Sequence, residues 1–95
     1  MTSKERSNLR SLASAAEPIG QVGKKGVSEN MIKSFSDALD ARELIKVSVL
    51  ENSEKSARET GEELAAALGA EFVAAIGKKV ILYRRSNRDI RHIEY

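Results

Sequence analysis

The chain has 95 residues, of which 41% are hydrophobic and 32% charged, and its formal net charge is +2. This length fits a single domain with a modest core, and this composition is typical of a folded protein rather than a disordered one. Because the chain has no cysteine and only one histidine, His92, composition excludes disulfides, thiolate nucleophiles and cysteine-based zinc sites. We therefore expect no metal and no cofactor.

Nothing in the sequence indicates a secretory or membrane segment. The N-terminal residues lack the apolar run of a signal peptide. No stretch approaches the roughly 18 apolar residues that a membrane span needs. We expect a cytoplasmic protein without a membrane partner.

The charges are distributed unevenly along the chain. Residues 1–26 hold five basic and two acidic groups (+3), residues 27–77 five and ten (−5), and residues 78–95 six and two (+4). If the fold brings both ends together, one face becomes positive and suits a polyanion such as a phosphate backbone. Charge alone leaves open a mixed surface with no partner.

The N-terminal quarter predicts a helix followed by a short strand. Thr2 and Glu5 have the spacing of a capping box, and apolar residues then recur at helical spacing. This helix should span about 3–15, because Pro18 disfavours helical backbone in the residue before it. The alternation in 19–22 predicts a short edge strand.

The middle of the chain predicts a helix, a strand and a second helix. A serine N-cap and an apolar stripe predict a helix over about 29–41. Apolar and polar residues alternate over 43–50, which is the clearest strand. Asn52 and Ser53 offer an N-cap for the next helix, which Gly69 closes.

The last third predicts a hairpin and a tail. Strands over 71–76 and 79–84 are joined at 77–78, where a leading glycine suits a type II′ turn. Residues 1–85 should therefore form one domain, and we expect 86–95 to be a loosely held basic tail. Strands that alternate with helices predict an α/β fold with a mixed sheet covered by helices.

The segment Gly23-Lys24-Lys25-Gly26, a GxxG loop between a strand and a helix, is the best candidate for chemistry. Its glycines allow close backbone approach, and the amides of the following helix favour an anion. Two lysines add charge, so the segment predicts a phosphate cradle. It lacks the spacing of a Walker loop or a dinucleotide fingerprint. The alternative is a turn that needs glycine, with lysines exposed for solubility.

Further basic groups extend this candidate site. A second Gly-Lys-Lys begins at Gly77, and hairpin tips often share a sheet edge with helix starts. Arginines after the last strand and cations on the first helix either join the patch or only solvate the surface. The candidate residues for contact with a phosphate backbone are Gly23, Lys24, Lys25, Gly26, Lys78, Lys79, Arg84, Arg85, Lys4 and Arg10.

Aromatic and catalytic signals are weak. Phe35 and Phe72 lie on apolar stripes and are predicted core residues, whereas Tyr83 either stacks on a base or packs in the strand. The absence of paired aromatics on two central strands disfavours a base-stacking platform. No base accompanies a serine or threonine nucleophile, so we predict no catalytic residue and no enzyme.

Three runs of sequence resemble a known family: PIGQVGKKGVSE at 18–29, ARELIKVSVL at 41–50 and IGKKVILYR at 76–84. In this order they are similar to the bacterial YhbY-type proteins, single-copy members of the CRM RNA-binding domain family. The resemblance covers the chain from Ser3 to about Arg85. It leaves the tail after Arg85 outside the pattern.

The resemblance implies a two-layer α/β domain (α+β) with a four-stranded mixed sheet, similar to the C-terminal domain of translation initiation factor 3. The last strand would run antiparallel to the others, and the loop Gly23–Gly26 would be the main RNA contact. Bacterial members of the family are associated with precursors of the large ribosomal subunit, and plant members assist splicing of organellar introns. A single domain copy fits the ribosomal role better.

The leading hypothesis is therefore a monomeric RNA-binding assembly factor for the large ribosomal subunit, with ribosomal RNA as partner and no small-molecule substrate. One alternative is a protein-interaction module whose acidic middle docks a basic ribosomal protein. Another is an RNA chaperone that remodels RNA without stable binding.

Overall fold

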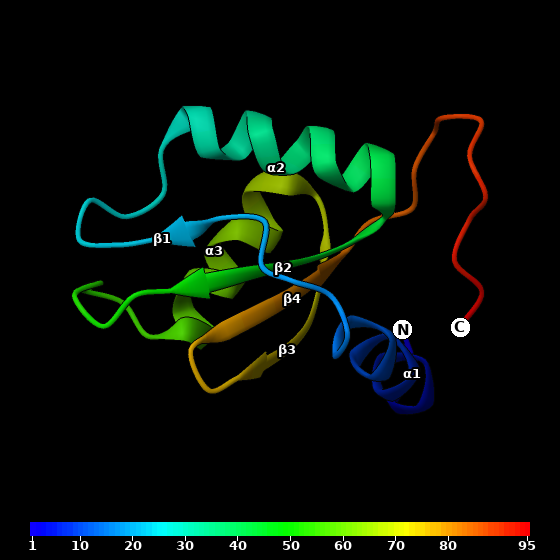
Figure 1. The fold of residues 1–95 in the computed structure, drawn as a ribbon, viewed down its shortest axis with the longest axis horizontal. Helices are drawn as coiled ribbons and strands as arrows, with labels where there is room; N and C mark the ends of the chain where they lie inside the picture. Colours follow the sequence, from blue (N-terminus) through cyan, green and yellow to red (C-terminus); the bar gives the residue numbers. More distant parts are fainter.

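The computed structural model describes residues 1–95 and has the predicted order of elements. The protein has three helices and four strands, and helix and strand alternate along the chain until the last two strands, which form a hairpin (Figure 1). Their bounds are α1 Ser3–Ala13, β1 Gln21–Val22, α2 Glu29–Arg42, β2 Leu44–Val49, α3 Ala57–Leu68, β3 Glu71–Ile76 and β4 Lys79–Tyr83.

The four strands form one mixed sheet in the order β1-β2-β4-β3. β1 pairs parallel with β2, and β4 pairs antiparallel with both β2 and β3. Strands β1, β2 and β3 therefore point in one direction, and the last strand runs against them between β2 and β3. This arrangement confirms the predicted four-stranded mixed sheet and its antiparallel last strand.

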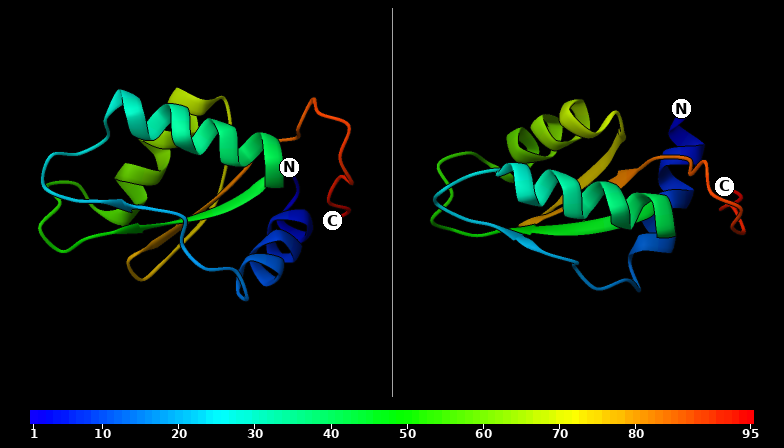
Figure 2. Two further views of the ribbon diagram at one scale, coloured as in Figure 1. Left: turned by 45° about the horizontal axis from the view of Figure 1, so that its top comes forward. Right: turned by 90° about the horizontal axis from the view of Figure 1, so that it is seen from above.

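Alternate residues of β4 show how the helices cover the sheet. Val80 and Leu82 belong to the main core, with residues of α2 and α3. Ile81 and Tyr83 point to the other face and pack with Leu9 of α1. The sheet and the pair α2 and α3 thus make the two predicted layers, and α1 covers part of the opposite face (Figure 2).

Most helix ends follow the predicted capping signals. Thr2 and Glu5 form a complete capping box, and Gly69 ends α3 with a left-handed φ of 61°. The start of α3 differs from the prediction, which placed its N-cap at Asn52 or Ser53. Ser56 is the N-cap, because its hydroxyl accepts from the Glu59 backbone and the Glu59 carboxylate accepts in return. The segment before it remains a loop.

A close contact explains the glycine inside α3. Gly61 is buried, and a β-carbon at this position would lie 2.6 Å from Val80 Cγ1. Glycine inside a helix costs about 1 kcal/mol relative to alanine. The close approach of α3 to the central strand β4 requires this glycine and offsets its cost.

The C-terminal tail is held against the domain, which corrects the expectation of a loose segment. Glu43, between α2 and β2, is fully buried and has a positive φ of 66°. Its carboxylate accepts hydrogen bonds from Ser86 N at 2.7 Å, Ile93 N at 2.7 Å and His92 Nδ1 at 2.6 Å. The rings of Tyr95 and Tyr83 then meet edge to face. One buried acid therefore anchors the tail at three points.

Those contacts also set the titration of the acid. Burial raises the pKa of Glu43, but the hydrogen bonds from Ser86, His92 and Ile93 outweigh it and hold the pKa below the usual value of 4.5. The charged form is the one that anchors the tail.

Candidate functional site

Three connecting segments meet at one end of the sheet. β1 and β2 both finish there, and β4 begins there because it runs in the opposite direction. Backbone hydrogen bonds join the segments: Leu50 N donates to Val22 O at 2.8 Å, and Val49 N donates to Lys78 O at 2.7 Å. We call residues 23–28, 50–56 and 77–79 together the loop end, which lies on the left in Figure 1.

The GxxG loop is a closed turn in which both glycines have a structural reason. Gly26 N donates to Gly23 O at 3.0 Å, and Gly26 has a φ of 72°, which side chains disfavour. A β-carbon on Gly23 would lie 3.3 Å from Leu50 Cδ1 in the neighbouring loop. The glycines therefore shape the turn and bring it against the β2–α3 loop.

Four lysines of the loop end project into solvent. Lys24 and Lys25 on the GxxG loop are exposed, as are Lys78 and Lys79 at the hairpin. None of them takes part in the ion pairs of the protein. Only β2 separates β1 from β4, so the strands next to the two lysine pairs lie about two strand spacings, roughly 10 Å, apart. Two segments far apart in sequence thus present unpaired lysine side chains at the same end of the sheet.

The start of α2 adds less to this edge than the sequence analysis expected. Ser28 caps the helix by accepting from Met31 N at 3.1 Å. Glu29 lies in the first turn, where its negative charge already complements the helix dipole. The lysines, more than the helix terminus, therefore give the loop end its attraction for anions.

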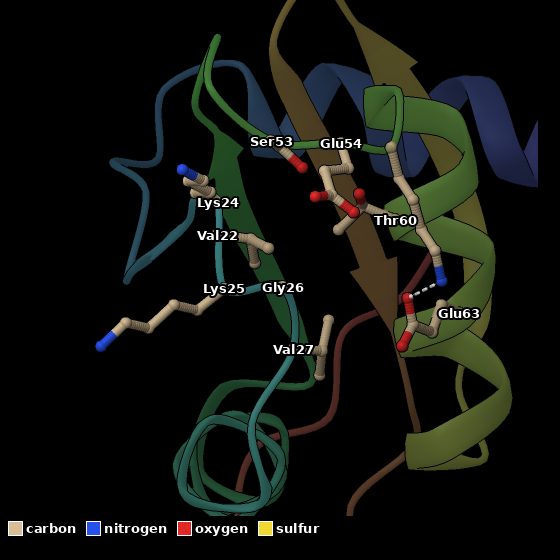
Figure 3. A pocket seen from close by; sticks show the side chains of 10 residues that line it. Val22, Lys24, Lys25, Gly26, Val27, Ser53, Glu54, Thr60 and Glu63 are labelled. Carbon is tan, nitrogen blue, oxygen red and sulfur yellow. Dashed lines mark hydrogen bonds and ion pairs between the residues drawn. The ribbon is translucent and has the colours of Figure 1, made fainter.

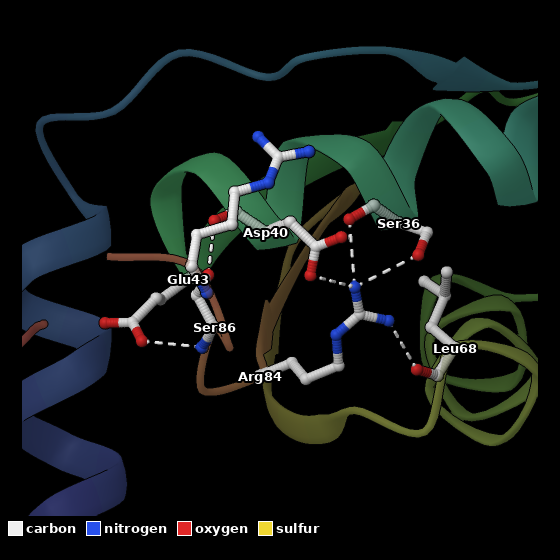
Figure 4. A network of polar contacts seen from close by, with 7 residues as sticks. Ser36, Asp40, Glu43, Leu68, Arg84 and Ser86 are labelled. Atoms are coloured by element: carbon white, nitrogen blue, oxygen red, sulfur yellow. Dashed lines mark hydrogen bonds and ion pairs between the residues drawn. The ribbon is translucent and has the colours of Figure 1, made fainter. Parts of the chain in front are cut away.

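Arg84, a predicted contact residue, has a structural role instead. Its guanidinium donates to Leu68 O at 2.8 Å, to Ser36 O at 2.9 Å and to Asp40 Oδ1 at 3.0 Å (Figure 4). Its side chain is 21% exposed. These bonds join β4 to α2 and α3, so we leave Arg84 out of the candidate binding surface.

The other predicted cations lie away from the loop end. Arg85 follows β4 at the opposite end of the sheet, where it lines a shallow hollow with Arg42 and Arg91. Lys4 and Arg10 lie on α1, which packs beside that end. The structure therefore divides the basic residues between two ends and does not gather all of them on one face.

The aromatic residues belong to the core. Phe35 is buried and Phe72 packs against the same cluster, as predicted. Tyr83 is 4% exposed, and its ring centroid lies 5.0 Å from that of Tyr95. Burial raises the pKa of Tyr83 to about 12. Strand packing, not base stacking, is the role that the structure gives Tyr83.

A cleft beside the GxxG loop was not predicted from the sequence. It lies between this loop and the first turns of α3, and it includes Ser53, Glu54 and the buried Thr60 (Figure 3). On its far wall Lys55 Nζ and Glu63 Oε1 form an ion pair of 2.8 Å. The predicted α3 began near residue 53, so residues 53–55 were assigned to the helix and not to the loop that lines this cleft.

No helix of the structure is long and apolar enough to cross a membrane. No group of three or more histidine, cysteine, aspartate or glutamate side chains is placed to hold a metal ion. The candidate site therefore consists of lysines, glycines and the cleft beside them.

Fold and loops define the class of protein: a small α+β domain with a glycine-lysine loop at a strand-to-helix junction. A family model for the CRS1/YhbY (CRM) domain matches residues 1–84, and the chain belongs to this family. It is 45% identical over 86 residues, 90% of either chain, to the Bacillus subtilis (strain 168) protein named "Probable RNA-binding protein YqeI". The solution structure of the hypothetical Staphylococcus aureus protein SAV1595, described as a proposed RNA-binding protein, is 44% identical. It superposes with a TM-score of 0.78 over 98% of this chain and 99% of that one.

Proposed function

We propose that this protein binds RNA through its loop end and that it assists assembly of the large ribosomal subunit. The observation that carries the proposal is the presence of four exposed lysines without ion-pair partners, which come from two segments distant in sequence and lie at the same end of the sheet. Family membership and the names of two relatives that are described as RNA-binding support it. The proposed partner is structured ribosomal RNA, bound by a cytoplasmic monomer without catalysis.

Phosphate contacts would dominate this binding. Each lysine that neutralises a phosphate releases a counterion, so affinity falls with salt, with a slope of about −0.7 to −0.9 per contact. Lys24 and Lys25 would contact one stretch of backbone, and Lys78 and Lys79 its continuation. Gly23 and Gly26 keep the turn compact, so the RNA backbone can come close to the protein backbone there.

The test is fluorescence anisotropy on labelled ribosomal RNA fragments with the double variant Lys24→Ala/Lys25→Ala. We expect affinity to fall about tenfold, because each exposed charge pair contributes about 0.7 kcal/mol. The salt slope should fall by about 1 for each lysine removed. Lys4→Ala/Arg10→Ala removes the same charge at the other end and is the matched control. Equal loss in both variants would contradict specific binding at the loop end.

The ribosomal role is tested by sedimentation of a cell extract on a sucrose gradient. We expect co-migration with precursors of the large subunit and its loss at high salt. Confinement to the light fractions at low salt would contradict stable association with ribosomal particles. Strand-annealing assays would then test transient chaperone activity.

The acidic-interaction alternative has weaker support in the structure. On α3, Glu62 already pairs with Arg58 and Glu63 with Lys55. Docking a basic protein there would first break these pairs. Reversal of the α3 glutamates should therefore leave the RNA-dependent behaviour unchanged.

A further inference from the structure

A second group of cations surrounds a hollow at the end of the sheet opposite the loop end. Arg42 lies in the last turn of α2, Arg85 follows β4, and Arg91 belongs to the C-terminal tail, which runs beside the end of α2 toward α1 in Figure 1. We call the depression that these three residues line the arginine hollow. Its volume of about 800 Å³ lies within the range of roughly 300–1,000 Å³ that is typical of ligand sites.

The anchored tail holds the backbone of this hollow in place. The Glu43 carboxylate accepts from Ser86 N and from Ile93 N, so Arg91 lies between two fixed points of the tail. Arg85 directly precedes the first of them. An arginine on a free tail would lose conformational freedom when it binds an anion, whereas the backbone that carries these two arginines is already ordered.

The acidic groups nearby leave the arginines without a partner. None of the three arginines takes part in the ion pairs of the protein. The neighbouring acids Asp40 and Glu43 already have partners, at 3.0 Å and 2.6 Å. Glu94 is the only carboxylate that lines the arginine hollow. Three guanidinium groups therefore face one carboxylate, and the excess of positive charge attracts anions.

The remaining lining of the arginine hollow is largely apolar. Leu12 of α1 is 52% exposed, and Leu44 and Ile93 are half-buried. An apolar wall of low dielectric strengthens the field of the cations beside it. The guanidinium fork also matches a phosphate group with two parallel hydrogen bonds. The combination suits a sugar-phosphate chain, whose phosphates meet the arginines while its sugars and bases rest on the apolar surface.

We propose that the arginine hollow is a second binding site for the phosphate backbone of the RNA bound at the loop end, an inference that rests on the proposed function. Lys79 and Arg85 are six residues apart, so their Cα atoms are separated by no more than about 22 Å. One RNA molecule can reach both, and contact at the first site raises the effective concentration of phosphate at the second. This reach favours RNA over an acidic peptide, which would bind the arginines alone.

The first experiment compares Arg42→Gln/Arg91→Gln with wild type in anisotropy titrations of labelled ribosomal RNA fragments. We expect affinity to fall about tenfold and the salt slope to fall by about 1 for each arginine removed. Lys4→Gln/Arg10→Gln removes the same charge from exposed positions on α1 outside the arginine hollow and is the matched control. Unchanged affinity in the arginine variant, or an equal loss in the control, would overturn the inference.

The contribution of the anchored tail is tested with Glu43→Gln, which weakens the anchor without changing an arginine. The loss of RNA affinity caused by Arg91→Gln should be smaller in the Glu43→Gln background than in wild type, because the tail no longer holds Arg91 in place. The loss caused by Arg42→Gln, on the helix, should be the same in both backgrounds. Equal losses for Arg91→Gln in the two backgrounds would overturn the role of the tail.

A further comparison separates this inference from the proposed function and from a protein partner. RNA affinity that falls in Lys24→Ala/Lys25→Ala but not in Arg42→Gln/Arg91→Gln would leave RNA binding at the loop end standing and overturn the second site. Binding of a polyglutamate peptide that only the arginine variant loses would then assign the arginine hollow to an acidic peptide. Loss of RNA affinity in both double variants would support both proposals, and no RNA binding by the wild type would overturn both.

Discussion

The two ends of the sheet use their charged residues in opposite ways. At the loop end, Lys24, Lys25, Lys78 and Lys79 are exposed and have no ion-pair partner. At the other end, which we call the anchor end and define by Asp40, Glu43, Arg84 and the tail 86–95, internal contacts occupy the charges of Asp40, Glu43 and Arg84. A basic residue in the sequence can therefore be a candidate for binding or a structural residue, and only its exposure and its contacts within the fold distinguish the two.

Arg84 against Lys79 makes the comparison concrete. Both are basic residues within six positions of each other on or beside β4. The planar guanidinium of Arg84 reaches acceptors on α2 and α3 at once, for which a lysine ammonium is poorly shaped. Lys79, at the start of the strand, faces solvent. The structure thus uses arginine for cohesion and lysine for the open edge.

The largest effect is expected for Arg84→Met. The variant leaves the carbonyls of Leu68 and Ser36 and the carboxylate of Asp40 without their donor, so we expect a loss of roughly 3 kcal/mol in the free energy of unfolding. Urea denaturation measures it. Arg85→Met, at the exposed neighbour, should change stability by less than about 0.5 kcal/mol. Similar losses in both variants would remove the distinction between the two ends.

The sequence was sufficient to predict the order of helices and strands. Local signals gave the element order, because caps, glycine stops and alternating strands act over a few residues. The capping box at Thr2 and Glu5 and the strand 43–50 are examples. The lysines of the loop end could be selected as candidate contacts because they lie beside glycines, and glycine marks a turn through its own backbone conformation.

The rest depended on contacts between distant residues. Arg84 bonds to residues 16 to 48 positions away, and Glu43 meets the tail 43 to 50 positions later. No local pattern marks a glutamate with positive φ as an anchor. For α3, by contrast, the N-cap was predicted at Asn52 or Ser53 and the capping box of Ser56 and Glu59 was overlooked, although that signal is local. Because the start of α3 was predicted too early, the cleft beside the GxxG loop was not predicted either.

A smaller effect is expected at Glu43, and it depends on pH. The folded protein holds the pKa of Glu43 below 4.5, so between the two values the unfolded chain binds more protons. The stabilisation is complete above pH 4.5 and is lost as pH falls through the folded pKa. Glu43→Gln should cost about 1–2 kcal/mol at pH 7, because a neutral amide accepts more weakly.

Urea denaturation at pH 7 and pH 3.5 measures this effect, with Glu51→Gln as an exposed control. The stability gap between wild type and Glu43→Gln should narrow at the lower pH, and amide signals of Ile93 should report release of the tail. A gap of equal size at both values would show that the Glu43 charge does not hold the anchor end.

The smallest effect on stability, and the sharpest test of the comparison, is expected for Lys78→Ala/Lys79→Ala. Since neither side chain has an ion-pair partner, the free energy of unfolding should stay within about 0.5 kcal/mol of wild type. RNA affinity should nevertheless fall, about as far as for Lys24→Ala/Lys25→Ala. In anisotropy titrations, the quadruple variant should lose the sum of both effects if the two pairs contact separate phosphates. A loss no larger than that of one pair would mean that only one of the two segments contacts the RNA.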